Sequence, residues 1–367
     1  MTLKLLYTCF SPAWGGLEKY ALELAVAEQR RGHDLLFACQ KDTTFEKEAK
    51  NAGIHCRAFP YHSHWDVPLM LHLRKIIKEE GRNTVHVHKS RDLRVVRPAV
   101  MGLTGAKLFY SLYMNVPGAK RDLYHRWIYS RMKRIFVSSS ELRDSAAKFL
   151  PVAAEQVAVL PYGMETDAFV PGRAEEFRRS LGLAPDALVI GVLSRLDPQK
   201  GQMDAVRAMP RVLQKFPKAH LLLVGDESFD YIGTEKKRLE EEVAQLDIGA
   251  SVSFLGYQHD AVSTLQAMDV FLLPSLNETY SLSMILALLC ALPAVGTNSG
   301  GTPEQLGFGK YGTLVPPQDP AGMAEGIISV LGNMDEAKYR GHAGRAMALE
   351  LHGMENMLAR LEGEYRS

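Results

Sequence analysis

Short apolar runs and longer amphipathic segments alternate along most of the chain. The short runs are rich in Val, Leu and Ile, which is typical of buried parallel strands. Strands that alternate with helices predict an α/β fold with parallel sheets. The predicted strands occupy residues 3–9, 34–39, 54–59, 84–88, 107–112, 135–138, 157–161, 188–194, 220–224, 252–257, 270–273, 294–297 and 312–315.

The segments between these strands repeat apolar residues every three or four positions, as surface helices do. The first of them starts at Leu17 and is closed by Gly32. Because the alternation runs through both halves of the chain, it predicts two doubly wound domains with a cleft between them. The predicted helices are 17–32, 45–52, 68–80, one from 138–140 onward, 175–181, 203–216, 234–246, 261–268, 281–292, 321–331 and, in mixed form, 335–365.

Residues 269–304 are the most informative stretch. Two predicted strands enclose a polar loop with Glu278 and an apolar helix that stops at Pro293. This order is a βαβ unit, and open α/β sheets bind ligands at the carboxyl ends of their strands. We expect free N–H groups around residues 279–281, at the start of the helix, to suit a phosphate or sugar hydroxyls.

A second polar group follows the strand predicted at 188–194. Arg195 and Lys200 lie five positions apart in the loop after it. The Arg fork and the Lys point charge together can clamp a diphosphate. A solvated surface pair is the alternative, which the motif around the two residues makes the weaker one.

These stretches resemble the signature of family-four retaining glycosyltransferases with the GT-B fold. The resemblance spans nearly the whole chain and implies that fold: α/β, two doubly wound Rossmann-like domains with a cleft between, and a C-terminal helix that crosses back to the first domain. It is carried by Ser275, Glu278, Pro293, the Gly300-Gly301-Thr302-Pro303-Glu304 turn, and Leu196, Asp197, Pro198 and Gly201 beside the basic pair.

The resemblance also sets the domain limits. Residues 162–169 are similar to the family's linker into the second domain. We expect an acceptor-side domain over residues 1–165 and a nucleotide-sugar-binding domain over residues 166–345. Residues 346–367 are expected to form the helix that packs back on the first domain.

The family's chemistry implies roles for the matching residues. Arg195, Lys200 and the helix N-terminus are expected to stabilise the charge that grows on the departing nucleoside diphosphate. Glu278 is expected to hold a hydroxyl of the donor sugar, and Tyr257 to face the base. The residues expected to bind the donor are Gly15, Gly16, Gly225, Tyr257, Thr279, Tyr280, Ser281, Leu282 and Leu286.

Two features of the first half of the chain can be given a function only through the family resemblance. Gly15-Gly16 joins the first strand to the first helix, where it can be simple turn chemistry or the family's loop against the donor. His86 and His88 point to the same face of a strand. A lone His is more often structural, but the family's second His approaches the donor sugar, so we interpret His88 as functional.

Two positions depart from the family pattern. Ala291 replaces a Gly, and Leu286 replaces the second Glu, which accepts hydrogen bonds from the ribose hydroxyls. Losing a charged hydrogen bond costs roughly 1.5–3 kcal/mol, about ten- to a hundred-fold in affinity. Leu286 therefore weakens donor binding without abolishing chemistry, or else it packs as part of an apolar helix.

Residues 120–134 concentrate positive charge. Asp122 is their one acid, and Leu123, Trp127 and Tyr129 interleave with the cations. A solvated helix face and docking on anionic lipid headgroups, or on an anionic acceptor, stay open as alternatives. The six basic residues are Lys120, Arg121, Arg126, Arg131, Lys133 and Arg134.

Composition and charge limit the class of protein, its partners and its cellular location. The 367 residues suffice for two domains, and 46% hydrophobic with 23% charged residues is typical of a soluble globular protein. A net charge of +1 gives no global field for nucleic acid. Neither a full signal-peptide core nor a run of 18 apolar residues occurs. We expect a cytoplasmic protein, with peripheral binding at the inner face of the membrane as an option.

The four cysteines show no metal-ligand spacing and suit a reduced cytosol. They are Cys9, Cys39, Cys56 and Cys290.

The leading hypothesis is a metal-independent retaining hexosyltransferase that uses a nucleotide-diphosphate sugar and no cofactor. Its acceptor is expected to be a glycan or a lipid-linked molecule, in polysaccharide or lipopolysaccharide synthesis. The family reacts by front-face attack, so no residue is assigned as nucleophile. The alternatives are a GT-B-like binding module, which Leu286 favours, and a nucleotide-sugar epimerase, which the Arg195–Lys200 motif disfavours.

Overall fold

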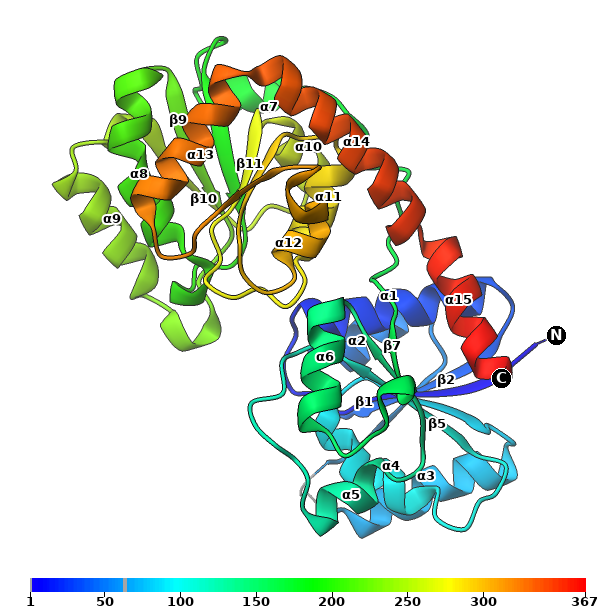
Figure 1. Ribbon diagram of the computed structural model, residues 1–367. Helices are drawn as coiled ribbons and strands as arrows, with labels where there is room; N and C mark the ends of the chain where they lie inside the picture. The colour runs from blue at the N-terminus through cyan, green and yellow to red at the C-terminus, as the bar shows by residue number, and fades with distance from the viewer. Residues whose placement is uncertain (1, 62–64) are drawn as a thin grey trace. The chain divides into compact units, whose positions relative to one another are not determined.

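The computed structural model describes residues 2–61 and 65–367. The chain forms two compact units, which are coloured along the sequence in Figure 1. The first unit comprises Met1–Gly163 and Met354–Ser367, and the second comprises Met164–Gly353. Across the described ranges, every helix is too short or too polar to span a bilayer.

The first unit contains a seven-stranded parallel sheet with the strand order β3-β2-β1-β4-β5-β6-β7. The order reverses between β1 and β4, and such switch points are where open α/β sheets bind ligands. The strands are β1 (Lys4–Cys9), β2 (Asp34–Gln40), β3 (Cys56–Phe59), β4 (Thr84–Val87), β5 (Lys107–Leu112), β6 (Met132–Val137) and β7 (Val157–Val159). The helices are α1 (Gly16–Arg30), α2 (Thr44–Asn51), α3 (Val67–Glu79), α4 (Leu93–Ala99), α5 (Leu123–Tyr129), α6 (Ser140–Phe149) and α15 (Met354–Arg366).

Both faces of this sheet are buried, which explains the continuous apolar runs. Successive side chains of a strand point to opposite faces, so Leu5 and Tyr7 enter one core while Leu6 enters the other. Helices α1, α2 and α15 cover the first core, and α3, α4, α5 and α6 cover the second.

The returning helix α15 is an integral part of the first unit. Tyr365 is 1% exposed, and its hydroxyl lies 2.8 Å from the Tyr7 hydroxyl and 2.5 Å from His86 Nδ1. The returning segment begins at Met354 rather than at residue 346, because α14 continues as far as His352.

The second unit contains a six-stranded parallel sheet with the order β10-β9-β8-β11-β12-β13, so its switch point lies between β8 and β11. Its strands are β8 (Leu188–Leu193), β9 (Ala219–Val224), β10 (Val252–Gly256), β11 (Val270–Leu273), β12 (Ala294–Thr297) and β13 (Thr313–Val315). Its helices are α7 (Glu175–Ser180), α8 (Gln202–Lys215), α9 (Glu235–Gln245), α10 (Ala261–Gln266), α11 (Leu282–Leu289), α12 (Thr302–Gln305), α13 (Pro320–Gly332) and α14 (Met334–His352).

Each predicted strand overlaps a strand of the structure, but some helices differ. Helix α4 was not predicted; it carries Pro98 inside its span. The basic segment 120–134 is not one helix face: α5 ends at Tyr129, and β6 takes up Met132–Val137. Arg134 therefore lies in a strand, where its Nε donates to Glu364 of α15 at 2.8 Å.

Candidate active site

The carboxyl end of β8 leads into the loop that carries Arg195 and Lys200. The loop is held from within the unit. The Asp197 carboxylate accepts a hydrogen bond from Ser228 Oγ at 2.8 Å, and the Arg195 carbonyl accepts one from Gln202 Nε2 at 2.7 Å. The Arg195 side chain is exposed. A fixed backbone thus presents a guanidinium to solvent at the switch point of the sheet.

Gly201 allows this loop to lie directly against the end of β11. Its φ of 68° is in the left-handed region, and a Cβ there would lie 2.0 Å from the Pro274 carbonyl oxygen. The Leu276 N–H also donates to the Gln199 carbonyl at 2.9 Å. The two loops at the switch point therefore form one backbone platform, and only glycine fits at 201.

Glu278 and Lys200 meet on this platform. Lys200 Nζ lies 2.5 Å from Glu278 Oε2, and the side chains are 23% and 15% exposed. Ser275 Oγ donates to the same oxygen at 3.3 Å, and the Gly301 N–H donates to the Glu278 carbonyl at 2.8 Å. Three of the residues predicted as catalytic, Arg195, Lys200 and Glu278, are thus gathered at the ends of β8 and β11.

The start of α11 differs from the expectation of free N–H groups. The Ser281 N–H donates to Gln305 Oε1 at 3.0 Å, and Gln305 Nε2 donates back to the Ser281 carbonyl at 2.8 Å. Ser281 Oγ caps the helix by accepting from the Met284 N–H. The Tyr280 ring is buried, with its hydroxyl 3.3 Å from His352 Nε2. The expectation is wrong for Ser281, whose N–H already has a partner.

Helix α11 turns one narrow face away from the core. Met284, Ile285, Ala287, Leu288 and Leu289 are buried, whereas Leu282, Ser283 and Leu286 are only partly buried. Leu286 lies four positions after Leu282 and three after Ser283, so it neighbours both on the helix surface. Leu286 is therefore on the partly accessible side of the helix.

Ala291, the other departure from the family pattern, is under backbone strain. Its φ is 56°, in the left-handed region. An L side chain costs roughly 1–2 kcal/mol there. The Gly expected at this position would adopt the same conformation freely.

A cavity of about 280 Å³ lies at the ends of β8, β9 and β10. Gly225, at φ 132°, lets the strand end approach β8, because a Cβ would lie 2.1 Å from the Ser194 carbonyl oxygen. The Tyr257 N–H donates to Asp226 Oδ1 at 3.0 Å, and its ring is 52% exposed. Close packing of the strand end against β8 is therefore enough to explain a glycine at position 225. The lining of the cavity includes Leu196, Gly225, Asp226, Glu227, Ile232 and Gly256.

In the first unit, the loop at Gly15-Gly16 is fixed by Glu18, which lies at the carboxyl end of β1. Glu18 Oε2 accepts from the Gly15 N–H at 3.1 Å, and Oε1 accepts from Ser11 Oγ and Lys89 Nζ, both at 2.7 Å. Burial alone would raise the pKa of Glu18, but hydrogen bonds from Lys89 and Ser11 leave it below its ordinary value. The loop is a rigid turn around a buried carboxylate.

His88 follows β4 and is 1% exposed. Its Nδ1 lies 2.8 Å from the Tyr113 hydroxyl, and its ring stacks on His86 with 4.4 Å between centroids. Burial lowers the pKa of His88 to about 3, so the imidazole is neutral near pH 7. Among the described residues, none is a hydrogen-bond partner for its Nε2. The ring is therefore neutral and enclosed, with one buried nitrogen that lacks a partner among the described residues.

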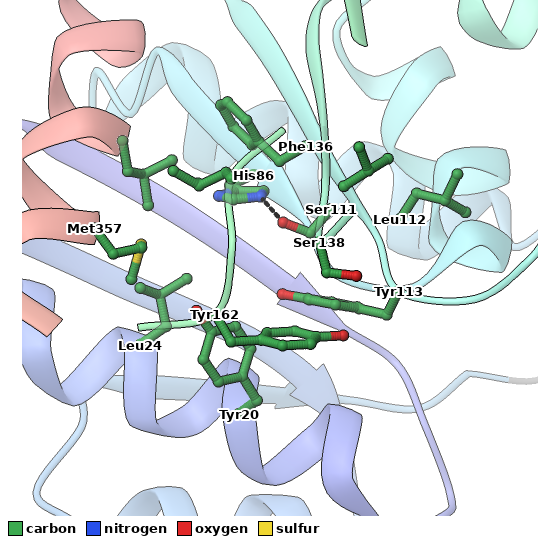
Figure 2. A pocket seen from close by; sticks show the side chains of 13 residues that line it. Tyr20, Leu24, His86, Ser111, Leu112, Tyr113, Phe136, Ser138, Tyr162 and Met357 are labelled. Carbon is green, nitrogen blue, oxygen red and sulfur yellow. Dashed lines mark hydrogen bonds between the residues drawn. The ribbon is translucent and has the colours of Figure 1, made fainter. Parts of the chain in front are cut away.

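Figure 2 shows the small cavity beside His86. The volume of about 10 Å³ is about that of one water molecule. His86 Nε2 is hydrogen-bonded to Ser111 Oγ at 2.8 Å. Tyr113 stacks on Tyr162 with centroids 5.8 Å apart, and Tyr20 meets the Tyr162 ring edge-on. The part of this sheet's carboxyl edge around His86 and His88 is thus aromatic and neutral.

Sequence reasoning missed three residues that shape these sites: Glu18, Asp92 and Gln305. Asp92 is fully buried and accepts from the Phe10 N–H at 3.0 Å, and burial raises its pKa to about 7. Glu18 had a detectable signal, since a Glu three residues after an N-cap forms a capping box. Asp92 and Gln305 have no such local pattern, because their partners are distant in sequence.

Within the described ranges, one group of three metal-ligating side chains lies close together: Glu28, His33 and Glu362. It lies at the amino ends of β1 and β2. His33 Nδ1 accepts from the Leu3 N–H at 3.3 Å, so Nε2 carries the proton in the neutral ring. That nitrogen faces Glu362 Oε1 at 3.1 Å as a donor, which does not suit a metal ligand. The expectation of no metal stays a prediction.

Two family models match adjoining parts of the chain. The model for Glycosyltransferase Family 4 matches residues 14–168, and the model for Glycosyl transferases group 1 matches residues 173–347. This chain belongs to the group 1 glycosyltransferases. The resemblance drawn from residues 269–304 and 195–201 is thereby confirmed.

The relatives of this glycosyltransferase differ in how much of the chain they match and in their sequence identity to it. A D-inositol 3-phosphate glycosyltransferase of Corynebacterium jeikeium is 33% identical over 47% of this chain, which spans only 42% of that protein. A GDP-mannose-dependent alpha-(1-6)-phosphatidylinositol monomannoside mannosyltransferase of Mycolicibacterium smegmatis is 28% identical over 93% of this chain and 92% of its own length.

A solved structure supports the fold. Alr3699/HepE of Anabaena, in complex with UDP and glucose, covers 100% of both chains with a TM-score of 0.84 and 20% identity. At that identity the likeness concerns architecture. Together with the two parallel sheets, it confirms the fold class predicted for the glycosyltransferase, a GT-B type with two Rossmann-like α/β domains.

Proposed function

We propose that this chain transfers a sugar, with retention of anomeric configuration, from a nucleotide-diphosphate donor, without a metal or cofactor. One observation carries the proposal: Arg195, Lys200 and Glu278 are gathered at the carboxyl ends of β8 and β11 on a backbone platform that Gly201 makes possible. Two cations and one carboxylate at a switch point suit a diphosphate beside a sugar hydroxyl.

The cations would act on the leaving group. As the bond from sugar to phosphate breaks, negative charge grows on the nucleoside diphosphate, and fixed positive groups stabilise it. The exposed Arg195 guanidinium can bind phosphate through two N–H groups. The attraction between Lys200 and Glu278 in the free protein orients both side chains before the donor arrives.

The other residues would hold the donor. Glu278 would accept hydrogen bonds from a hydroxyl of the donor sugar. His88 Nε2 and the Gly15-Gly16 backbone would contact the sugar as neutral groups. The remaining proposed donor contacts are Gly225 and Tyr257 near the base, and Thr279, Tyr280, Ser281, Leu282 and Leu286 along the start of α11. Because the Ser281 N–H is already bonded, Thr279 and the helix dipole remain for phosphate there.

The acceptor would be a glycan or a lipid-linked molecule, in polysaccharide or lipopolysaccharide synthesis at the inner face of the membrane. The phosphatidylinositol mannoside substrate in the name of the mycobacterial relative supports a lipid-linked acceptor. The donor base is not fixed by the relatives, since one name specifies GDP-mannose and the HepE complex contains UDP.

A second candidate is a binding module that holds a nucleotide sugar without transferring it. Leu286 favours this candidate, because an apolar side chain lies on the accessible face of α11 where the family has a carboxylate. The third candidate is an epimerase, which the Arg195–Lys200 pair disfavours.

A donor panel tests the proposal. UDP-, GDP- and ADP-sugars are each incubated with the protein, and melting temperature, free sugar and anomeric configuration are measured. A ligand that binds only the native state raises its melting temperature. We expect one donor to stabilise the protein and to be hydrolysed slowly to the sugar with its original anomeric configuration. Stabilisation without turnover would favour the binding module, an epimerised nucleotide sugar the epimerase, and an inverted anomer would refute retention.

A further inference from the structure

An exposed apolar surface lies where the start of α3 meets α5 in the first unit, at the helices labelled in Figure 1. Leu123 is 83% exposed and Trp65 is 55% exposed. The Trp65 ring lies 5.8 Å from Tyr124 and 6.5 Å from Trp127, measured between centroids. We name this group the α3–α5 surface, and its members are Trp65, Val67, Leu71, Leu123, Tyr124 and Trp127.

The charges along α5 are almost entirely positive. Arg121 and Arg126 are exposed, and each donates a side-chain hydrogen bond to a backbone carbonyl rather than to a carboxylate. Asp122 is the one acid between residues 113 and 140. Its carboxylate accepts from the His125 N–H at 3.1 Å and lies 2.5 Å from His125 Nδ1. The positive charge along α5 therefore outweighs the single negative charge of Asp122.

A cavity of about 70 Å³ opens beside Tyr124. Arg94, Lys120, His125 and Ser90 line it, and none of its lining residues is a carboxylate. The side chains of Arg94 and Lys120 are partly buried. Taking cations out of water is costly without an opposite charge, so this cavity is suited to an anion.

We propose that the α3–α5 surface docks on an anionic lipid bilayer and that the cavity beside Tyr124 receives a lipid phosphate. The proposal deepens the function proposed above and rests on its membrane-side acceptor. It also revises the segment that the sequence suggested, because Lys133 and Arg134 lie in β6, while Val67 and Leu71 of α3 and Trp65 just before it join the surface.

The chemistry of the surface favours a bilayer over a soluble phosphate. Trp and Tyr are suited to the interface of a membrane, where the ring meets acyl chains and the polar atom meets water. Exposed Leu and Val side chains would stabilise insertion by leaving water. Cations beside them are attracted to anionic headgroups. A free phosphate would need the cavity but would gain nothing from the exposed Trp65 and Leu123.

Co-sedimentation of the full chain with vesicles tests the proposal. Vesicles of phosphatidylcholine alone are compared with vesicles containing a large fraction of phosphatidylglycerol, at low and high ionic strength. We expect clear preference for the anionic vesicles and weaker binding at high salt. Lys120→Gln and Arg94→Gln should each lower partitioning to anionic vesicles about fivefold. Leu123→Ser should lower partitioning to both kinds of vesicle.

Lys133→Gln is the matched control, because it removes the same charge from an exposed position of the same segment, in β6. It should bind vesicles nearly as the wild type does. Equal binding to neutral and anionic vesicles, no binding to either, or equal losses for Lys120→Gln and Lys133→Gln would overturn the proposal. If inorganic phosphate stabilises the wild type but not Lys120→Gln, and vesicles do not bind, the cavity takes free phosphate and docking is refuted.

Donor hydrolysis separates this proposal from the proposed function. Lys120→Gln should hydrolyse the donor as fast as the wild type, because Lys120 is not among the residues proposed to bind the donor. Normal hydrolysis without vesicle binding would refute docking alone. Vesicle binding without any turnover would refute sugar transfer and leave docking supported.

Discussion

The carboxyl edges of the two sheets have the same topology but opposite chemistry. At the edge of the second sheet, Arg195 is exposed and Lys200 and Glu278 are partly exposed. At the edge of the first sheet, His88 is 1% exposed and packed among aromatic rings. Both edges are switch points of a doubly wound sheet, so the difference comes from the side chains and not from the fold.

This contrast teaches that one architecture can present two different chemical surfaces at the same topological position. Charged groups that remain partly hydrated can exchange water for the phosphates of a ligand at low cost, whereas a buried charge would have to be paired beforehand. The part of the first edge around His88 is instead neutral, because burial lowers the pKa of His88 to about 3. Elsewhere on that edge, burial raises the pKa of Asp92 to about 7, and Glu18 is already paired with Lys89. The charged edge suits a diphosphate, and the neutral edge suits hydroxyl groups.

The largest expected effect comes from removing the cations of the charged edge. Arg195→Ala and Lys200→Ala should each lower turnover about 100-fold or more, since each loses a group that stabilises the leaving diphosphate. Melting temperatures should change little, because the Lys200–Glu278 pair is partly exposed and such pairs contribute roughly 0–1 kcal/mol. Steady-state donor hydrolysis and thermal melts measure both.

Lys215→Ala is the control for this pair, since Lys215 is an exposed cation in the last turn of α8. It should retain the wild-type rate. Near-normal rates for both Arg195→Ala and Lys200→Ala would show that the leaving-group assignment is wrong, and that the charged edge is merely a solvated surface.

A smaller effect is expected when a carboxylate is restored to α11. Leu286→Glu should tighten nucleotide binding about tenfold, the lower range for a charged hydrogen bond. Because Leu286 shares the partly exposed face with Leu282 and Ser283, the new charge should remain solvated and the melting temperature should be preserved. Isothermal titration and one melt measure the two quantities.

Leu286→Gln supplies the matched neutral side chain and should give a weaker gain. A loss of several kcal/mol in stability without tighter binding would be the signature of a buried unpaired charge. In that case Leu286 is structural, and the donor is held differently from the rest of the family.

The smallest effect is expected in the pH dependence of the neutral edge. Because the pKa of His88 lies near 3, His88→Gln should slow donor hydrolysis without changing the shape of its profile between about pH 5 and 8. Unfolding exposes an imidazole of ordinary pKa near 6.5, so the unfolded state binds the proton first as the pH falls. The contribution of His88 to stability should therefore be lost from about pH 7 downward, and His88→Gln should be destabilised less than the wild type by the same fall in pH.

His259→Gln, at an exposed position, is the control and should leave both profiles unchanged. If the wild-type rate shows a step near pH 6.5 that disappears in His88→Gln, the imidazole of His88 is not buried and neutral. It would also remove the contrast between the two edges.

The sequence predicts the scaffold better than the fine structure of the sites. Strands buried on both faces produce apolar runs that can be recognised locally, and β11 and β12 coincide with the predicted 270–273 and 294–297. The positions of Arg195, Lys200 and Glu278 were also predictable, because residues after strands of one parallel sheet meet at one edge. The ion pair between Lys200 and Glu278 follows from that topology.

What could not be predicted depends on partners far apart in the chain. Gln305 takes the Ser281 N–H from 24 positions away, and Asp92 meets the Phe10 N–H across 82 positions. No local pattern reports such bonds. Burial of His88 has the same origin, because its ring is enclosed by side chains from β1, β2 and β4 and from the segment after β5.

The two-part composition of the first unit has a consequence for how the protein is made. Helix α15 supplies Met357, Leu358, Leu361 and Tyr365 to the core that covers β1 and β2. While the ribosome is still translating the second unit, that core lacks one wall, and the apolar face over β1 is open to water and to chaperones. The second unit is a single continuous segment, so all of its residues are available before α15 is synthesised. The first unit therefore cannot complete this core until the last helix of the chain has been synthesised.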